Sequence, residues 1–180
     1  MTSSQAPVAS RRLRMVYQNE NYRLLEYRPT LCKPLLYLLE PLRLIRRVRL
    51  MWEVVRKNSM RVYYLMVDDS VVGYCVVTPG GRRLKCSTEK DIVIGPYYIG
   101  ESYRGFGYSK TLIQQTLSHC GYEYESAYDW IEKENIASIK ATEACGFQRV
   151  GELNVVGFAR RLKIVEKDGK DWIYRYKKRD

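Results

Sequence analysis

The chain has 180 residues, is 46% hydrophobic and carries a formal net charge of +11, which predicts one globular domain that can bury a core. No apolar run reaches the roughly 18 residues needed to span a bilayer. The chain has five cysteines without paired spacing and one histidine, which argues against a Cys/His zinc site. We therefore expect a cytoplasmic, metal-free protein with reduced cysteines, with a disordered tail over 1–10 and a single domain over 11–180.

The N-terminal third of the chain predicts strand and then helix. Residues 14–18 and 22–28 alternate loosely and predict a first strand. After an apolar stretch over 31–39, Pro41 opens a predicted helix over 41–57, because apolar residues recur there at helical spacing. Arginine and lysine side chains fill the rest of this helix. They form either the solvated face of a core-packed helix or a surface for an anionic or membrane-associated acceptor.

The remaining two thirds of the chain alternate strands and helices. Two β-rich runs, 60–67 and 71–78, are joined by Asp68-Asp69-Ser70 and predict a hairpin. Further strands are expected at 91–99, 124–131, 147–156, 158–165 and 172–176, and helices at 103–120 and 135–145. This order predicts an α/β fold with a mixed sheet.

A glycine-spaced turn separates the strand at 91–99 from the helix that follows. It reads Arg104-Gly105-Phe106-Gly107-Tyr108-Ser109. Such a turn exposes successive backbone N–H groups at a helix N-terminus, and these donors, with the helix dipole, suit a phosphate or diphosphate. The two glycines allow a close backbone approach and a positive φ. The turn alone is also compatible with a simple tight connection, and it matches neither the nucleoside-triphosphatase loop nor the dinucleotide fingerprint.

A second motif lies downstream, at 135–147, and reads Asn-Ile-Ala-Ser-Ile-Lys-Ala-Thr-Glu-Ala-Cys-Gly-Phe. With both motifs in order, the chain resembles the GNAT superfamily of N-acetyltransferases, over about residues 60 to 150. The family's first signature is Arg/Gln-x-x-Gly-x-Gly/Ala, and its second has Asn, a small residue, Tyr and Gly-Phe at fixed spacing. Arg104 and Gly107 match the first signature, and Ser109 stands at its final Gly/Ala position, a small change that a phosphate turn should tolerate. The residues that match the second signature are Asn135, Ser138, Gly146 and Phe147.

The resemblance implies a mixed, mostly antiparallel central sheet with splayed strands flanked by helices. It also implies direct transfer of an acetyl group from acetyl-CoA to an amine. The backbone from Arg104 to Ser109, including Gly105, Phe106, Gly107 and Tyr108, would bind the diphosphate. The backbone of Tyr98 and Ile99 would hold the pantetheine amides, and one N–H there would polarise the thioester carbonyl. Asn135 would bond the pantetheine arm, which the helix carrying Ser138 would flank.

The acceptor amine must lose a proton, and a carboxylate is the usual base. Glu101 and Asp129 are the candidates, whereas alternation from Tyr98 places Asp91 on the other face of its strand. Thr142 stands where the family often has a tyrosine that acts as general acid, and a threonine hydroxyl is a poorer acid than a phenol. Tyr128 or Tyr97 could supply a phenol instead.

The acceptor is expected to be a primary amine of a small molecule or an amino sugar. The basic helix over 41–57 suggests an anionic or membrane-associated acceptor. No recognisable module predicts specific binding of nucleic acid, and a homodimer is compatible with the sequence. A different class of function stays open, in which the domain binds CoA without turnover and acts as an interaction module.

Overall fold

The computed structural model describes residues 12–37, 39, 54, 60–81, 84, 86–156, 161–165 and 168–178. The helix expected over 41–57, apart from the helical residue Val54, and the tail over 1–10 lie outside these residues. The chain forms two compact units, which are described one at a time. Unit 1 comprises Met1–Val77 and Pro96–His119, and unit 2 comprises Thr78–Gly95 and Cys120–Asp180. A single domain over 11–180 stays a prediction.

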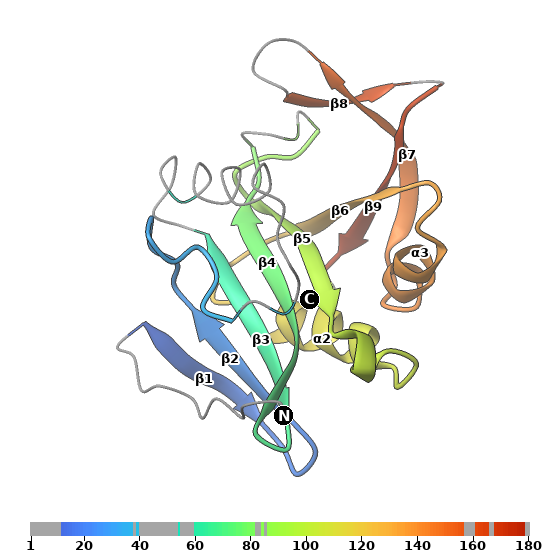
Figure 1. Ribbon diagram of the computed structural model, residues 1–180. Coiled ribbons are helices and arrows are strands. Elements are labelled where there is room, and N and C mark those ends of the chain that lie inside the picture. Colours follow the sequence, from blue (N-terminus) through green and yellow to red (C-terminus); the bar gives the residue numbers. More distant parts are fainter. Residues whose placement is uncertain are drawn as a thin grey trace. The chain divides into compact units, whose positions relative to one another are not determined.

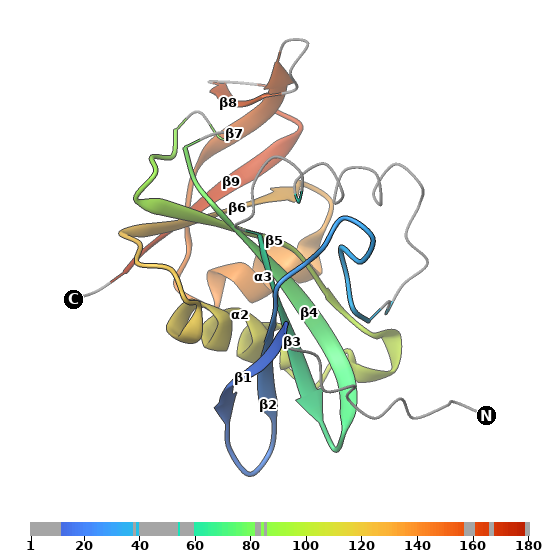
Figure 2. The ribbon, with the colours of Figure 1, turned by 90° about the vertical axis from the view of Figure 1, so that its left-hand side faces the viewer.

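The strands of unit 1 form an antiparallel series. β1 (Leu13–Gln18), β2 (Arg23–Tyr27), β3 (Arg61–Val67) and β4 (Ser70–Pro79) pair in chain order. The tips of the β1–β2 and β3–β4 hairpins lie at the same end of the unit (Figures 1 and 2). Strand β4 reaches unit 2 at its end, and β5 (Asp91–Ile99) begins in unit 2 and ends in unit 1.

The first 28 residues differ from the expectation, because 14–18 and 22–28 form a hairpin rather than one strand. The turn is built by Asn19, whose side-chain oxygen accepts hydrogen bonds from the backbone N–H groups of Asn21 at 3.0 Å and Tyr22 at 2.9 Å. Such a bond imitates a backbone turn. Asn19 therefore reverses the chain without the glycine or proline that usually marks a reversal.

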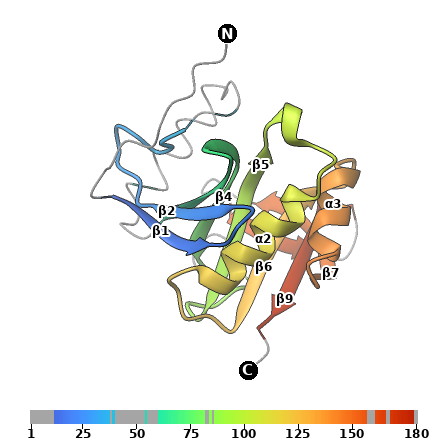
Figure 3. The ribbon, with the colours of Figure 1, turned by 90° about the horizontal axis from the view of Figure 1, so that it is seen from below.

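The two faces of the unit 1 sheet are covered differently. On one face, a cluster of buried apolar and tyrosine side chains includes Tyr64, whose hydroxyl accepts hydrogen bonds from the backbone N–H groups of Leu36 at 2.7 Å and Tyr37 at 3.3 Å. On the other face, α2 (Tyr108–His119) contacts β1, β2 and β3, as Figure 3 shows. Gly73 on β4 lets the end of β5 lie close, because a Cβ there would lie 2.4 Å from the Ile99 side chain and 2.7 Å from the Tyr98 carbonyl oxygen.

A buried carboxylate lies among the strands of unit 1. Glu26 is 1% exposed and accepts a hydrogen bond from the Tyr63 hydroxyl at 3.0 Å. It pairs with Arg61 at 3.0 Å, Arg28 at 3.4 Å and Arg14 at 3.6 Å. Burial alone would raise the pKa of Glu26, but these partners outweigh it and hold the pKa below its ordinary value. The carboxylate is thus kept charged inside the fold.

Unit 2 is a mixed sheet. The first residues of β5 pair in parallel with β6 (Ser126–Glu132), which pairs antiparallel with β9 (Asp171–Lys177). β9 pairs with β7 (Gln148–Val156), and β7 pairs with β8 (Arg161–Val165). The helix α3 (Ile136–Glu143) contacts β6. A core cluster of Leu84, Val93, Tyr128, Leu153 and Ile173 holds these strands together.

The expected mixed, mostly antiparallel sheet with helices is confirmed. The helix expected over 103–120 is shorter, because a 3₁₀ turn, η1 (Glu101–Tyr103), and the glycine turn precede α2. The strand expected over 158–165 is described only as β8. Among the described helices, none combines the length and the apolar character needed to cross a bilayer.

Candidate functional site

The glycine turn in unit 1 has the backbone shape of an anion-binding cradle. Gly105 has φ +86° and Gly107 has φ +79°, and a Cβ on either residue would meet nothing within 4 Å. The backbone N–H of Thr111 donates to the Gly107 carbonyl at 3.2 Å, so α2 begins at once after the turn. The first N–H groups of a helix have no intrahelical acceptor, and the first turn of α2 contains no acidic residue that would repel an anion. The turn therefore offers backbone donors to a phosphate.

Arg104 is fixed beside the same turn. Its Nε donates to the Ile99 carbonyl at 3.2 Å, and its guanidinium lies 5.3 Å from the centre of the Tyr98 ring. Glu101 forms a loose pair with it at 3.9 Å, but both side chains are largely exposed, so this pair contributes little. A permanent positive charge is thus held next to the turn.

The end of β5 leads into this turn. The backbone N–H of Gly100 donates to the Val72 carbonyl at 2.9 Å, which ties the strand end to β4. The parallel ladder of β5 comprises residues 91–93, and Tyr98 and Ile99 lie beyond its end. Ile99 is buried and Tyr98 is half-buried against Tyr74, with ring centres 6.2 Å apart.

In unit 2, Asn135 is the N-cap of α3. Its side-chain oxygen accepts a hydrogen bond from the backbone N–H of Ser138 at 3.2 Å, which explains the three-residue spacing of the two in the motif. The side chain of Asn135 is exposed. Its amide NH₂ group can therefore donate to a ligand while its oxygen caps the helix.

The same unit contains a buried carboxylate–hydroxyl pair. The Thr142 hydroxyl on α3 donates to Oδ2 of Asp129 on β6 at 3.1 Å, and the two residues are 0% and 3% exposed. Burial raises the pKa of Asp129 to about 7, although the hydrogen bonds from Thr142 and from the Trp130 backbone lower it. Asp129 can therefore take up and release a proton near neutral pH.

Gly95 and Tyr174 complete the surroundings of Asp129. Gly95 has φ +102°, and a Cβ there would lie 3.2 Å from Oδ1 of Asp129. Tyr174 pairs with Asp129 across β6 and β9, and its hydroxyl donates to Glu143 on α3 at 3.2 Å. Gly95 was not among the residues predicted from the sequence, although an isolated glycine inside a strand is a known sign of a close approach.

The other candidate residues lie in different surroundings. Tyr128 points to the opposite face of β6 from Asp129 and packs in the core cluster, where burial raises its pKa. Glu101 is exposed in η1. Asp91 accepts hydrogen bonds from the backbone N–H of Thr88 at 2.7 Å and from the Thr88 hydroxyl at 2.8 Å, so its carboxylate braces a turn. Of the candidates, the structure brings together Asp129 and Thr142.

No group of three or more His, Cys, Asp or Glu side chains that could hold a metal ion occurs among the described residues. The candidate groups for binding a cofactor are the backbone donors of the turn and the side chain of Asn135.

Comparison with known proteins adds the family context. The sequence model of the acetyltransferase (GNAT) family matches residues 25–147. No curated protein matches the chain closely enough to count as a relative.

Solved structures with the same fold are distant in sequence. The RimL ribosomal L7/L12 α-N-protein acetyltransferase is 14% identical over 96% of this chain and 98% of its own, with a TM-score of 0.63. An acetyltransferase from Thermus thermophilus is 16% identical over 77% of each chain, with a TM-score of 0.56. The putative acetyltransferase yncA from Salmonella typhimurium, solved with its cofactor acetyl-CoA, is 20% identical over 72% of each chain, with a TM-score of 0.52.

Proposed function

Because this chain belongs to the GNAT acetyltransferase family, we propose that it transfers the acetyl group of acetyl-CoA to a primary amine. In this reaction the amine nitrogen attacks the thioester carbonyl, a C–N bond forms and the C–S bond breaks. The proton lost by the nitrogen ends on the CoA thiol. The observation that carries the proposal is the glycine turn at the start of α2, with positive φ at Gly105 and Gly107 inside the region that matches the family.

The turn is the proposed site for the CoA diphosphate. The backbone N–H groups between Arg104 and Ser109, including those of Phe106 and Tyr108, would donate to its oxygens. The Arg104 guanidinium adds a nearby positive charge. The backbone of Tyr98 and Ile99, beyond the parallel ladder of β5, is proposed to hold the pantetheine amides, and the exposed amide of Asn135 is proposed to donate to the same arm. Ser138 contributes the backbone N–H that holds Asn135 in place.

Asp129 is the proposed proton acceptor for the attacking amine. A general base works best when its pKa lies near the operating pH, and burial raises the pKa of Asp129 to about 7. Thr142 donates to it and fixes its orientation. The alternative base, Glu101, is an exposed carboxylate paired with Arg104.

The group that protonates the thiolate stays a proposal, with a threonine hydroxyl and two phenols as candidates. Thr142 occupies the family's tyrosine position, and its hydrogen bond to Asp129 gives its hydroxyl a proton source. Tyr128 and Tyr97 carry phenols, but Tyr128 is committed to the core cluster. A pH–rate profile of Thr142→Ala separates them, because an unchanged rate and profile would exclude Thr142 as the acid.

The acceptor is proposed to be a small molecule or an amino sugar with a primary amine. An anionic or membrane-associated acceptor would depend on the basic helix over 41–57, which lies outside the described residues apart from Val54. Cytoplasmic location and a homodimer likewise stay predictions.

A second function has one observation in its favour. Thr142 replaces the family's tyrosine and is fully buried in a hydrogen bond to Asp129, so no phenol is presented at that position. A domain built in this way could bind CoA and act as an interaction module without turnover.

One experiment separates the two functions. Release of free thiol from acetyl-CoA is followed with a panel of primary amines, and binding of CoA is measured in parallel by calorimetry. Acceptor-dependent thiol release supports the transferase. Binding of CoA without thiol release from any acceptor supports the interaction module. The matched control is Asp69→Asn, a surface substitution outside the glycine turn, which should change neither the thiol release nor the binding of CoA.

A further inference from the structure

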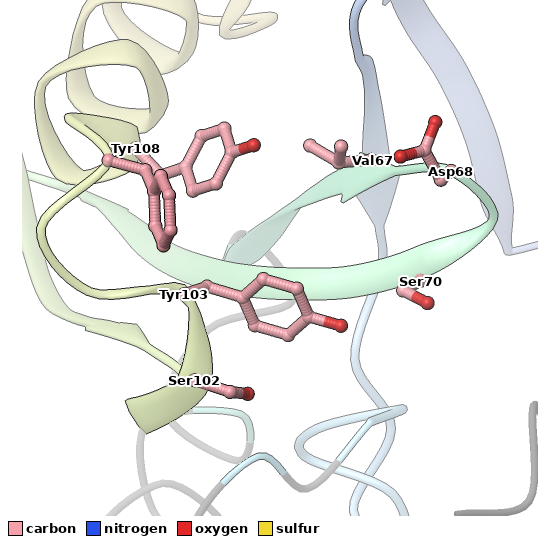
Figure 4. A pocket seen from close by; sticks show the side chains of 7 residues that line it. Val67, Asp68, Ser70, Ser102, Tyr103 and Tyr108 are labelled. Carbon is pink, nitrogen blue, oxygen red and sulfur yellow. The ribbon is translucent and has the colours of Figure 1, made fainter.

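A pocket of about 280 Å³ lies in unit 1, between the β3–β4 hairpin and the glycine turn. Its described lining combines two tyrosines, one phenylalanine, two serines, one valine and one aspartate. These residues are Tyr103, Phe106, Tyr108, Ser70, Ser102, Val67 and Asp68. Figure 4 shows the rings of Tyr103 and Tyr108 on one side and Asp68 with Ser70 on the other. No lysine or arginine is among the lining residues, although the chain carries 31 of them.

The aromatic rings are held in place by the backbone. A Cβ on Gly100 would lie 3.3 Å from the Tyr103 ring, so the absence of a side chain there leaves room for that ring. Phe106 stands between two residues with positive φ, Gly105 and Gly107, and its side chain is 72% exposed. Its ring centre lies 6.1 Å from that of Tyr108. Phe106 therefore presents an exposed apolar ring at the pocket.

The carboxylate of the pocket differs from its neighbour in the sequence. Asp69 forms an ion pair with Arg23, whereas Asp68 has no ion-pair partner among the described residues. Asp68 adopts φ +46° in the hairpin turn, a conformation that asparagine or aspartate tolerates best after glycine. Among the described residues, the pocket therefore offers one carboxylate without an ion-pair partner beside three aromatic side chains.

We propose that this pocket binds the alkylammonium group of an acceptor that has a second amine. Aromatic faces attract cations through their quadrupole, and a carboxylate adds a charge-assisted hydrogen bond. The volume is several times the roughly 30 Å³ that one water occupies, which leaves room for the ammonium and a few methylene groups.

This inference rests on the proposed function, and it narrows the acceptor class. An ammonium held by a carboxylate stays protonated, so it cannot be the nitrogen that attacks the thioester. The acceptor therefore needs another amine for the reaction. Ser102 follows Ile99 by three residues, so at most about 10 Å of chain separates the pocket from the proposed pantetheine strand. A short linear diamine fits this separation.

The test compares putrescine with butylamine, which has the same carbon chain and one amine. Putrescine binding is first measured by calorimetry without acetyl-CoA, and thiol release is then measured with both amines. The variants are Asp68→Asn and Phe106→Ala, and the control is Asp69→Asn, which removes the same charge from the same hairpin outside the pocket. Asparagine tolerates the backbone of position 68, so Asp68→Asn should fold normally.

We expect putrescine to bind at least about tenfold more weakly to Asp68→Asn and Phe106→Ala, with little change for Asp69→Asn. We also expect the KM for putrescine to rise in Asp68→Asn while the KM for butylamine stays the same. Equal losses of putrescine affinity in Asp68→Asn and Asp69→Asn, or a KM for putrescine that is unchanged in Asp68→Asn, would overturn the inference. If putrescine binds as expected but no amine releases thiol, the proposed function fails while the pocket assignment survives.

Discussion

Replacing Asp129 with asparagine tests the buried carboxylate of unit 2. Asparagine has nearly the same shape and can still accept the hydrogen bond from Thr142, but it carries no titrating group. The folded protein holds Asp129 with a pKa of about 7, whereas its ordinary value is 3.8. The variant therefore removes one specific contribution to the pH dependence of the free energy of unfolding.

The sign and size of that contribution follow from proton binding. Because the pKa is raised in the folded state, the folded protein binds more protons than the unfolded chain between about pH 4 and 7. The contribution of Asp129 to stability is fully present below the unfolded pKa and is lost as pH rises through about 7. The difference between 3.8 and about 7 corresponds to a loss of about 4 kcal/mol as an upper value.

The assay is urea unfolding of both proteins at several pH values from about 4 to 8. Any effect of the amide that is independent of pH appears as a constant offset. On top of this offset, the free energy of unfolding of Asp129→Asn minus that of the unmodified protein should rise with pH and level off above about 7. A difference that is constant over this range would refute a raised pKa for Asp129, and with it the argument for Asp129 as the base.

Three further predictions address the turn, the hydroxyl and the other buried carboxylate. In Gly105→Ala and Gly107→Ala, an alanine must adopt the left-handed backbone of the turn, at a cost of about 1–2 kcal/mol. Acetyl-CoA should therefore bind about tenfold more weakly to each variant by calorimetry. Unchanged affinity would contradict a binding role for the turn. Thr142→Val removes a hydrogen bond that lowers the pKa of Asp129, so the acidic limb of the pH–rate profile should move to higher pH. A limb that does not move would contradict an effect of Thr142 on the pKa of Asp129. The free energy of unfolding of Glu26→Gln, measured with urea, should be about 2–3 kcal/mol lower at pH 7. This loss should shrink as pH falls below about 4.5, because a carboxylate whose pKa is lowered by folding stabilises the protein only above its unfolded pKa. A loss that is constant with pH would contradict a lowered pKa of Glu26.

Much of the fold could be predicted because the local signals were strong. The β3–β4 hairpin and the glycine turn follow from alternation and from glycines at a strand–helix junction, and Gly146 indicates the end of α3. The β1–β2 hairpin was missed because its turn uses the side chain of Asn19 instead of glycine or proline. Local patterns cannot show that such a bond forms in preference to a continued strand.

The candidate site could be predicted only in part, because its contacts join distant positions. Asp129 and Thr142 were both candidates, but their hydrogen bond joins residues 13 positions apart on a strand and a helix. The alternation of a strand places Tyr128 and Asp129 on opposite faces of β6, but it does not predict which of the two faces α3. The burial of Glu26 was equally hidden, because it depends on arginines from β1, from β3 and from the residue after β2, which converge on one carboxylate.

The most direct test of the account is the binding of CoA and of pantetheine to the folded protein by calorimetry. If the backbone between positions 104 and 109 binds the diphosphate, CoA should bind and pantetheine, which lacks that group, should bind at least about a hundredfold more weakly. Equal affinity for both compounds, or no association with CoA at all, would contradict the assignment of this turn.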